Sequence, residues 1–189
     1  NTHVIVAPDA GVLELISVAV DQGPGGIVRA DAATVRVPSA SVSVISDGTV
    51  ESINDGVVVI TAGGDLTLHD VTLSGVFDIE GNGTARVTGS FLHNDGLIRV
   101  DSNNSSSSAV LDFADPISLS GSGTIEMIQV GDRSQVTTST GATLTHGADH
   151  TIQGRGRIYA SLVNNGIIRA NQTNTNLELL GGAKVNNNL

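Results

Sequence analysis

Two of the five histidines have a spacing that could bind a metal. His146 and His150 enclose residues 147–149, and the His-x-x-x-His spacing binds zinc when both rings lie on one face of a helix. Here the flanking residues alternate as in strands, and a glycine lies between the two histidines. We therefore expect a polar loop at this place and no metal site.

Two acidic pairs could serve glycoside hydrolysis, which needs two carboxyl groups on opposite sides of the scissile bond. Asp112 and Asp115 could face one groove, and Asp65 and Asp70 flank a strand-like run. Sugar-binding grooves normally also present aromatic platforms, whereas this chain has three Phe, one Tyr and no Trp. The sequence shows no G-x-S-x-G, no phosphate-binding G-x-x-x-x-G-K-[ST] and no Ser/His/Asp context. We expect no catalytic residue and no enzyme.

No cofactor is predicted, with calcium as the one open alternative. Asp95 and Asp101 lie where the chain is expected to turn, and their oxygens could hold a hard cation. The G-G-x-G-x-D repeat that loads calcium into β-rolls is missing.

Charge and cysteine content exclude several classes of function. Nine basic residues stand against 19 acidic ones, and the formal net charge is -10. Nucleic acids and anionic membranes both attract basic surfaces, so neither is an expected partner. The chain has no cysteine, which excludes disulfide bonds and thiolate metal sites.

The elements that must position these residues are short strands. Runs such as Leu66–Leu73, Leu97–Asp101 and Thr124–Val130 alternate apolar with polar residues and are separated by Gly, Asn, Asp or Ser. Roughly sixteen such runs fill the chain, and no run has the period of a helix. The pattern predicts an all-β protein with a narrow aliphatic core.

Two kinds of turn recur before these strands. One is Asn-x-Gly and the other is Gly-x-Gly, and both provide residues that accept the left-handed conformations a corner requires. Asparagines at equivalent corners can also stack as a hydrogen-bonded ladder. The predicted corner residues are Asn54, Gly56, Gly81, Gly83, Asn94, Gly96, Gly121, Gly123, Gly154, Gly156, Asn164 and Gly166.

The order of these turns favours a solenoid. A Gly-x-Gly unit at 81–83 precedes the Asn-x-Gly unit at 94–96, and the same order recurs at 154–156 and 164–166. Asx-Gly is also the preferred hairpin turn, so an antiparallel β-sandwich is the alternative. A sandwich has no need to repeat its turns in order. We predict a parallel β-solenoid of about eight coils, each of about 20–25 residues.

No change of composition marks a domain boundary. Residues 103–108 are Asn-Asn-Ser-Ser-Ser-Ser and predict a loop that bulges from one coil. The chain opens without methionine and stops inside an expected repeat. We therefore expect residues 1–189 to be a single solenoid segment of a longer chain.

Three phrases carry a resemblance to a known group of proteins. They are FLHNDGLIRVD at 91–101, GSGTIEM at 121–127 and SLVNNGIIRAN at 161–171. They resemble bacterial β-solenoid exoproteins, such as filamentous-haemagglutinin-like proteins, autotransporter passengers and other repetitive surface proteins. The resemblance is clearest over residues 50–189. It implies a right-handed parallel β-helix, export and a role in adhesion or extracellular scaffolding, and it supplies no catalytic residues.

These observations together predict a secreted structural or adhesive module that forms a stiff rod or filament at the cell surface. The alternative is a glycan-binding or glycan-cleaving solenoid, similar to a tailspike or a polysaccharide lyase. The expected partners are a second copy stacked end to end or neighbouring segments of a longer chain, and a surface glycan or host ligand. Open solenoid ends present unpaired strand edges, and neither end of the sequence resembles a polar cap.

Overall fold

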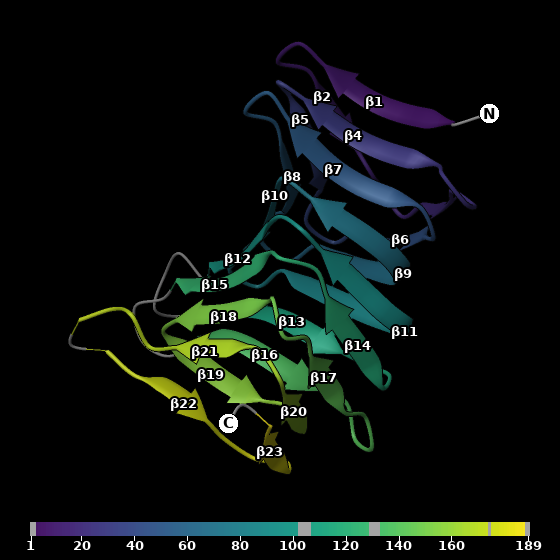
Figure 1. Ribbon diagram of the computed structural model, residues 1–189. Coiled ribbons are helices and arrows are strands. Elements are labelled where there is room, and N and C mark those ends of the chain that lie inside the picture. Colours follow the sequence, from purple (N-terminus) through teal and green to yellow (C-terminus); the bar gives the residue numbers. More distant parts are fainter. Residues whose placement is uncertain (1–2, 102–106, 129–132, 174, 188–189) are drawn as a thin grey trace.

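The chain is wound into coils that stack along one axis. The computed structural model describes residues 3–101, 107–128, 133–173 and 175–187. Within these ranges the chain forms 23 strands and no helix, and therefore no helix that could span a membrane. The first coil lies at one end of the stack and the last coil lies at the other (Figure 1).

Each coil contributes a strand to each of three faces. The first face consists of β1 (Val4–Pro8), β4 (Ile27–Asp31), β7 (Thr49–Ile53), the second halves of β9 (Asp65–Ser74) and β11 (Thr84–Asn94), β14 (Ile117–Ser120), β17 (Leu144–His146), β20 (Leu162–Asn164) and β23 (Lys184–Asn186). The second face consists of β2 (Val12–Glu14), β5 (Thr34–Val37), β8 (Val57–Ile60), β10 (Val76–Glu80), β12 (Leu97–Asp101), β15 (Thr124–Ile128), β18 (Thr151–Gly154) and β21 (Ile167–Arg169). The third face consists of β3 (Ala19–Asp21), β6 (Val42–Ser46), the first halves of β9 and β11, β13 (Ala109–Phe113), β16 (Ser134–Thr138), β19 (Gly156–Tyr159) and β22 (Leu177–Leu179).

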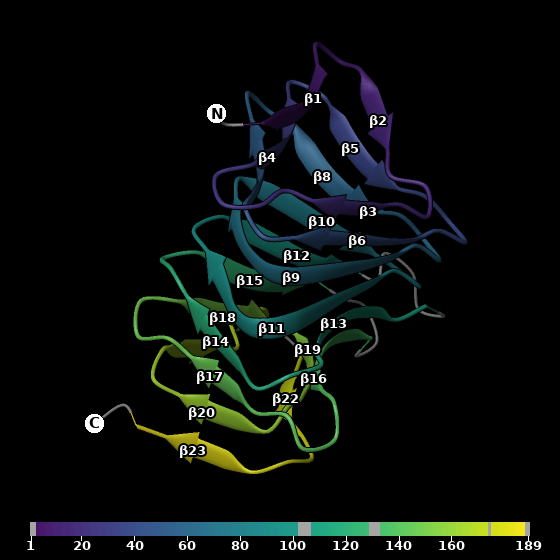
Figure 2. The same ribbon diagram turned by 90° about the vertical axis from the view of Figure 1, so that its right-hand side faces the viewer.

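Strand pairing is parallel throughout the described residues. Every strand pairs with strands one coil before or after it, and β9 and β11 bend across a corner to join the first and third faces (Figure 2). The prediction of a parallel β-solenoid is therefore confirmed, and the antiparallel sandwich is excluded. Nine strand segments stack on the first face, which gives eight steps of about 4.8 Å and a stack about 40 Å tall.

Coil length varies more than the predicted 20–25 residues. The register advances by 27 residues from Leu119 to His146 and by only 18 residues from His146 to Asn164. Strand pairing nevertheless continues without interruption, because the corners absorb the difference. Most of the loop predicted at 103–108 lies outside the described residues.

Inward-facing aliphatic side chains form continuous columns inside the stack. On the second face Val35, Val58, Phe77, Ile98, Ile125 and Ile152 follow one another in register from coil to coil. Each of them is at most 4% exposed. Full burial of one such side chain stabilises the fold by about 1.5–3 kcal/mol. Each added coil extends every column by one residue, so the stability of the core grows coil by coil.

Outward-facing arginines pair with carboxylates one coil away. Five ion pairs of this kind join direct register partners: Arg29–Glu51, Arg36–Glu14, Arg86–Asp112, Arg99–Asp78 and Arg157–Glu178. Five of the nine basic residues therefore form ion pairs between neighbouring coils, and these five do not gather into a basic patch. Each pair also favours one register, because a slip would separate the two charges.

Candidate functional site

The predicted corner residues fall at two of the three corners. The Asn-x-Gly units at 54–56, 94–96 and 164–166 lie between the first and second faces. The Gly-x-Gly units at 81–83 and 154–156 lie between the second and third faces. The third Gly-x-Gly unit, at 121–123, lies at the same corner as the Asn-x-Gly units. The three Gly-x-Gly units therefore do not occupy equivalent corners, and grouping them as one repeat was wrong.

Gly121 shows why this corner selects glycine. Its φ is 97°, and a Cβ atom there would lie 2.2 Å from the carbonyl oxygen of Asn94 in the preceding coil. Coils approach so closely at this corner that a side chain cannot fit without moving the backbone.

A buried polar column runs along the inside of the same corner. The Asn94 amide nitrogen lies 2.9 Å from His150 Nε2, and His150 Nδ1 lies 3.1 Å from His146 Nε2. His146 Nδ1 lies 2.6 Å from Asn164 Oδ1, and the Asn164 amide donates to Asn186 Oδ1 at 2.9 Å. Both histidines are 0% exposed, and Asn94 is 1% exposed. The column spans five stacked coils, from that of β11 to that of β23, and four of them contribute side chains to it.

The donors of this column all point the same way. Asn94 donates to His150, His150 to His146, His146 to Asn164 and Asn164 to Asn186, with both imidazoles neutral and protonated at Nδ1. An extra proton on either ring would place N–H against N–H. Burial, together with the neighbouring His146, lowers the pKa of His150 to about 3, and burial also lowers the pKa of His146.

The expectation of a polar loop at His146 and His150 is corrected by this column. His146 ends β17 and faces inward, and the 147–150 turn brings His150 back against it, with ring centroids 5.2 Å apart. The sequence contained a signal for this arrangement. Leu144-Thr-His146 has the same aliphatic-x-polar pattern as Leu162-Val-Asn164, which predicts the same inward position for His146 and Asn164. No group of three or more His, Cys, Asp or Glu side chains in the described ranges could hold a metal ion.

The predicted asparagine ladder is only partly formed. Asn94 and Asn164 belong to the buried column, where two histidines separate them. Asn54 instead lies outside, where its amide donates to Asp31 Oδ1 at 2.8 Å. On the outside of the same corner Asn187 donates to Asn165 Oδ1 at 3.0 Å.

A second polar chain lies on the outer surface at the end of β11 and β14. His93 Nδ1 lies 3.0 Å from Ser120 Oγ, and His93 Nε2 lies 2.8 Å from Asp95 Oδ2. His93 and Ser120 are direct register partners in neighbouring coils. Asp95 Oδ1 accepts the Ser122 backbone amide at 2.9 Å, and this bond, together with the His93 ring, lowers the pKa of Asp95.

The sequence interpretation that no Ser/His/Asp context exists was therefore wrong. Ser120 lies 27 residues after His93, which is one coil, and only the register brings the two side chains together. Asp95 already accepts hydrogen bonds on both oxygens, and Asp101 lies at the other end of β12. The two predicted calcium ligands are thus separated by a strand.

The acidic residues proposed for glycoside hydrolysis are engaged at a different corner. Asp70 Oδ1 accepts the backbone amides of Ser90 and Phe91 at 2.6 and 3.0 Å, and Asp115 Oδ2 accepts the amide of Gly89 at 2.9 Å. Although burial opposes it, these two amide bonds to Asp70 lower the pKa of its carboxyl group. Asp70 and Asp115 thus fix the turn of β11 from the coils on either side.

The other two acids lie on the third face, away from this corner. Asp112 accepts a hydrogen bond from Thr137 at 2.7 Å and contacts Arg86, while Asp65 is exposed at the start of β9.

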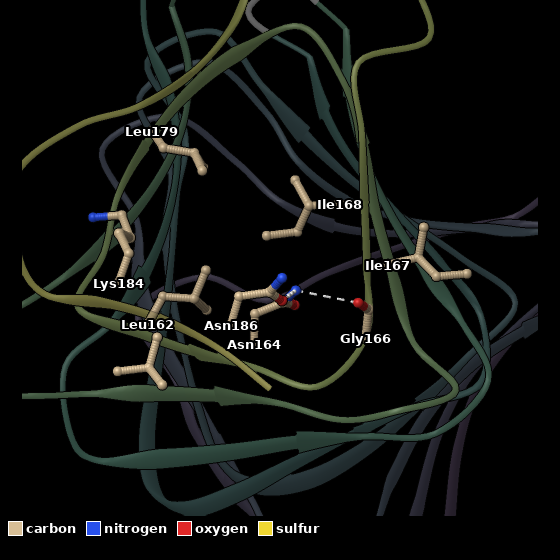
Figure 3. A pocket seen from close by; sticks show the side chains of 9 residues that line it. Leu162, Asn164, Gly166, Ile167, Ile168, Leu179, Lys184 and Asn186 are labelled. Atoms are coloured by element: carbon tan, nitrogen blue, oxygen red, sulfur yellow. Dashed lines mark hydrogen bonds between the residues drawn. The ribbon is translucent and has the colours of Figure 1, made fainter. Parts of the chain in front are cut away.

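Both ends of the stack are hollowed. At the C-terminal end a cavity of about 500 Å³ is lined by residues that include Leu162, Ile168, Leu179 and Asn186. The first three side chains point into the hollow coil, and Asn164 and Asn186 meet inside it (Figure 3). At the N-terminal end a cavity of about 380 Å³ is lined by residues that include Ile5 and Val20. The candidate functional features of the described residues are these two end surfaces, the buried polar column and the outer hydrogen-bonded chain of Ser120, His93 and Asp95.

Comparison of the chain with protein-family models, with characterised proteins and with solved structures found no match.

Proposed function

We propose that this chain is an extracellular structural module, a stiff solenoid rod that extends by stacking end to end with a second copy or with neighbouring segments of a longer chain. The observation that carries the proposal is the parallel pairing that continues from coil to coil between β1 and β23, which encloses one continuous aliphatic core. We expect a rod built on such a core to resist bending. It suits a role that depends on reach and rigidity, such as adhesion or scaffolding at a cell surface.

The N-terminal end supports the stacking part of this proposal. Ile5 belongs to the same inward column as Val28 and Val50, but it is 40% exposed where they are 0% and 1% exposed. The first coil leaves a set of large aliphatic side chains exposed: Val4, Ile5, Val6, Val12, Ile16 and Val18. Another coil laid on β1 would cover Ile5 and pair the free edge of the strand.

The C-terminal end is more polar than the sequence suggested. Lys184 and Asn186 hold the register positions that Leu162 and Asn164 hold one coil earlier. Lys184 Nζ donates to the carbonyl oxygens of Leu180, Gly181 and Gly182 at the adjoining corner. A partner at this end would therefore meet amide and ammonium groups around the apolar cavity.

The test is the length of the particles in solution. Sedimentation velocity over a range of concentrations should show species heavier than one 19.2 kDa chain. Electron microscopy should then show rods or filaments longer than one stack of coils. Ile5→Lys should reduce this association because it places a charge in the end surface. Val42→Lys is the matched control, since Val42 is 61% exposed on the side of the stack.

Two results would contradict the stacking proposal. One is a single compact species at every concentration. The other is an equal loss of association in Ile5→Lys and Val42→Lys, which would point to lateral contacts or to a general effect of charge.

A glycan-binding role is the second candidate. Phe91 is 38% exposed on the first face, and Tyr159 is 37% exposed on the third face. The two rings thus lie on different faces, and no single groove would use both as platforms. Retention on a panel of immobilised polysaccharides, or shortening of a polysaccharide, would favour this role over the purely structural one.

A further inference from the structure

We propose that Ser120 is an activated nucleophile that accepts an acyl group from small esters, with His93 as its general base. This activity would be separate from the rod function. The observation that carries it is the unbroken hydrogen-bonded chain Ser120–His93–Asp95, with distances of 3.0 and 2.8 Å. Both distances are within the reach that general-base activation of a serine requires.

The three side chains are held in place by backbone structure on both sides. His93 and Ser120 are on adjacent strands and in register, so the pleat holds their side chains next to each other on the outer face. Asp95 is fixed by two hydrogen bonds to Ser122, from its backbone amide at 2.9 Å and from its hydroxyl at 3.2 Å. Asp95 is thus a positioning residue that orients the imidazole.

The protons balance with a neutral imidazole. Nε2–H of His93 donates to Asp95, which leaves the Nδ1 lone pair to accept the hydroxyl proton of Ser120. When Oγ attacks an ester carbonyl, a bond forms between Oγ and the carbonyl carbon, and the proton moves to Nδ1. The carbon–oxygen bond to the leaving group then breaks, and the proton on Nδ1 is available to the leaving oxygen. Water, deprotonated by the same nitrogen, releases the acid and restores Ser120.

The surroundings favour an ester with an aromatic leaving group. Phe91 is two residues before His93 on the same outer face, is 38% exposed, and pairs in register with Ser118. Its ring offers an apolar surface beside the nucleophile. The nucleophile lies on the outer face, where a long acyl chain would stay exposed to water. A small acyl group such as acetyl therefore fits this site better.

The test uses 4-nitrophenyl acetate as the probe. Release of nitrophenolate should be accompanied by a one-acetyl increase in mass, which peptide mapping should place on Ser120. His93→Gln retains a hydrogen-bonding side chain but removes the base, and it should slow acetylation of Ser120 by about 10²-fold or more. Asp95→Asn should also slow it while leaving the melting temperature nearly unchanged.

The chain contains a matched control in another histidine–hydroxyl pair. His69 Nδ1 lies 3.1 Å from Thr88 Oγ1, also between neighbouring coils on the outer surface. His69→Gln should leave the acetylation of Ser120 unchanged.

The variant Phe91→Ala tests the aromatic surface beside the nucleophile. It should slow the acetylation of Ser120 more for an aryl ester than for an alkyl thioester. The proposal is overturned if Ser120 is acetylated at the same rate in the native chain and in His93→Gln, or if the label is found only on Lys184 or other groups.

Discussion

Acid should weaken the coils that contain the buried polar column, and the size of the effect can be worked out for His150. Its pKa is about 3 in the folded chain, against an ordinary value of about 6.5 when it is unfolded and solvated. Between these two values the unfolded state binds the proton and the folded state does not. The free energy of unfolding therefore falls as the pH falls through this window, and the contribution of His150 is complete above about pH 6.5.

At pH 5 the loss from His150 alone is about 2 kcal/mol relative to pH 8. The pKa of His146 is lowered in the same direction, so it adds to the loss. A folded ring that accepted a second proton would lose a hydrogen bond of the column, because its Nε2–H would then face the N–H of the residue that donates to it.

The measurement is urea unfolding followed by circular dichroism at several pH values, on the native chain and on the double variant His146→Gln/His150→Gln. A glutamine amide can accept from the preceding residue of the column and donate to the next, so the variant keeps the direction of the hydrogen bonds without a titrating group. The difference between the two proteins cancels the carboxyl groups that titrate in the same range. It should change by at least about 2 kcal/mol between pH 8 and pH 5.

The variant His69→Gln, measured at the same pH values, provides the control for the loss of an imidazole outside the column. A parallel loss of stability from pH 8 to pH 5 in the native chain and in the double variant would contradict this role of the column. So would nitrogen NMR spectra that show both buried rings as imidazolium ions at pH 5 while the chain stays folded.

Two further predictions follow from the corners and the faces. Gly121→Ala should destabilise the chain by more than about 1 kcal/mol, because its Cβ would meet the Asn94 carbonyl oxygen. Gly141 also has a positive φ but nothing within 4 Å of its Cβ position, so Gly141→Ala should destabilise the chain less. Thermal unfolding compares the two variants, and an equal loss of stability would show that crowding at Gly121 is unimportant. A double-mutant cycle on Arg99 and Asp78, whose side chains are 38% and 23% exposed, should give a coupling of at most about 1 kcal/mol that weakens with salt, and a coupling independent of salt would contradict the ion pair.

The fold class and the number of coils could be predicted because both depend on patterns that repeat along the chain. Alternation of aliphatic and polar residues places one face of every strand inside, as the column from Val35 to Ile152 shows. Recurrent turns before these strands then favoured stacked coils over a sandwich, and the structure has about eight.

Local sequence could not decide between a corner and a hairpin. Asn54 and Asp55 have φ values of 50° and 63°, which are the left-handed values of a hairpin turn of type I′. Yet β7 and β8 on either side of this turn belong to different faces and pair with strands in other coils. The pairing partner of a strand is set by the whole coil and cannot be read from the turn.

The pattern of the strands could predict that His146 and Asn164 face inward, but not which side chains meet in the buried column or in the Ser120–His93–Asp95 chain. Each of these contacts depends on the length of a particular coil. Ser120 meets His93 across a 27-residue coil, and His146 meets Asn164 across an 18-residue coil. A constant period of 20–25 residues would place other residues opposite each other. Coil length depends on the number of residues at the corners, and this number is known only once the pairing of the strands is known.

The variable corner between the second and third faces makes this chain suitable for carrying foreign peptides. Arg155 alone separates β18 from β19, whereas residues 170–176 separate β21 from β22 one coil later. Both pairs of strands still stack in register, β18 on β21 and β19 on β22. An epitope grafted at this corner would therefore project from the side of the rod and leave the core unchanged, and natural insertions could accumulate there by the same route.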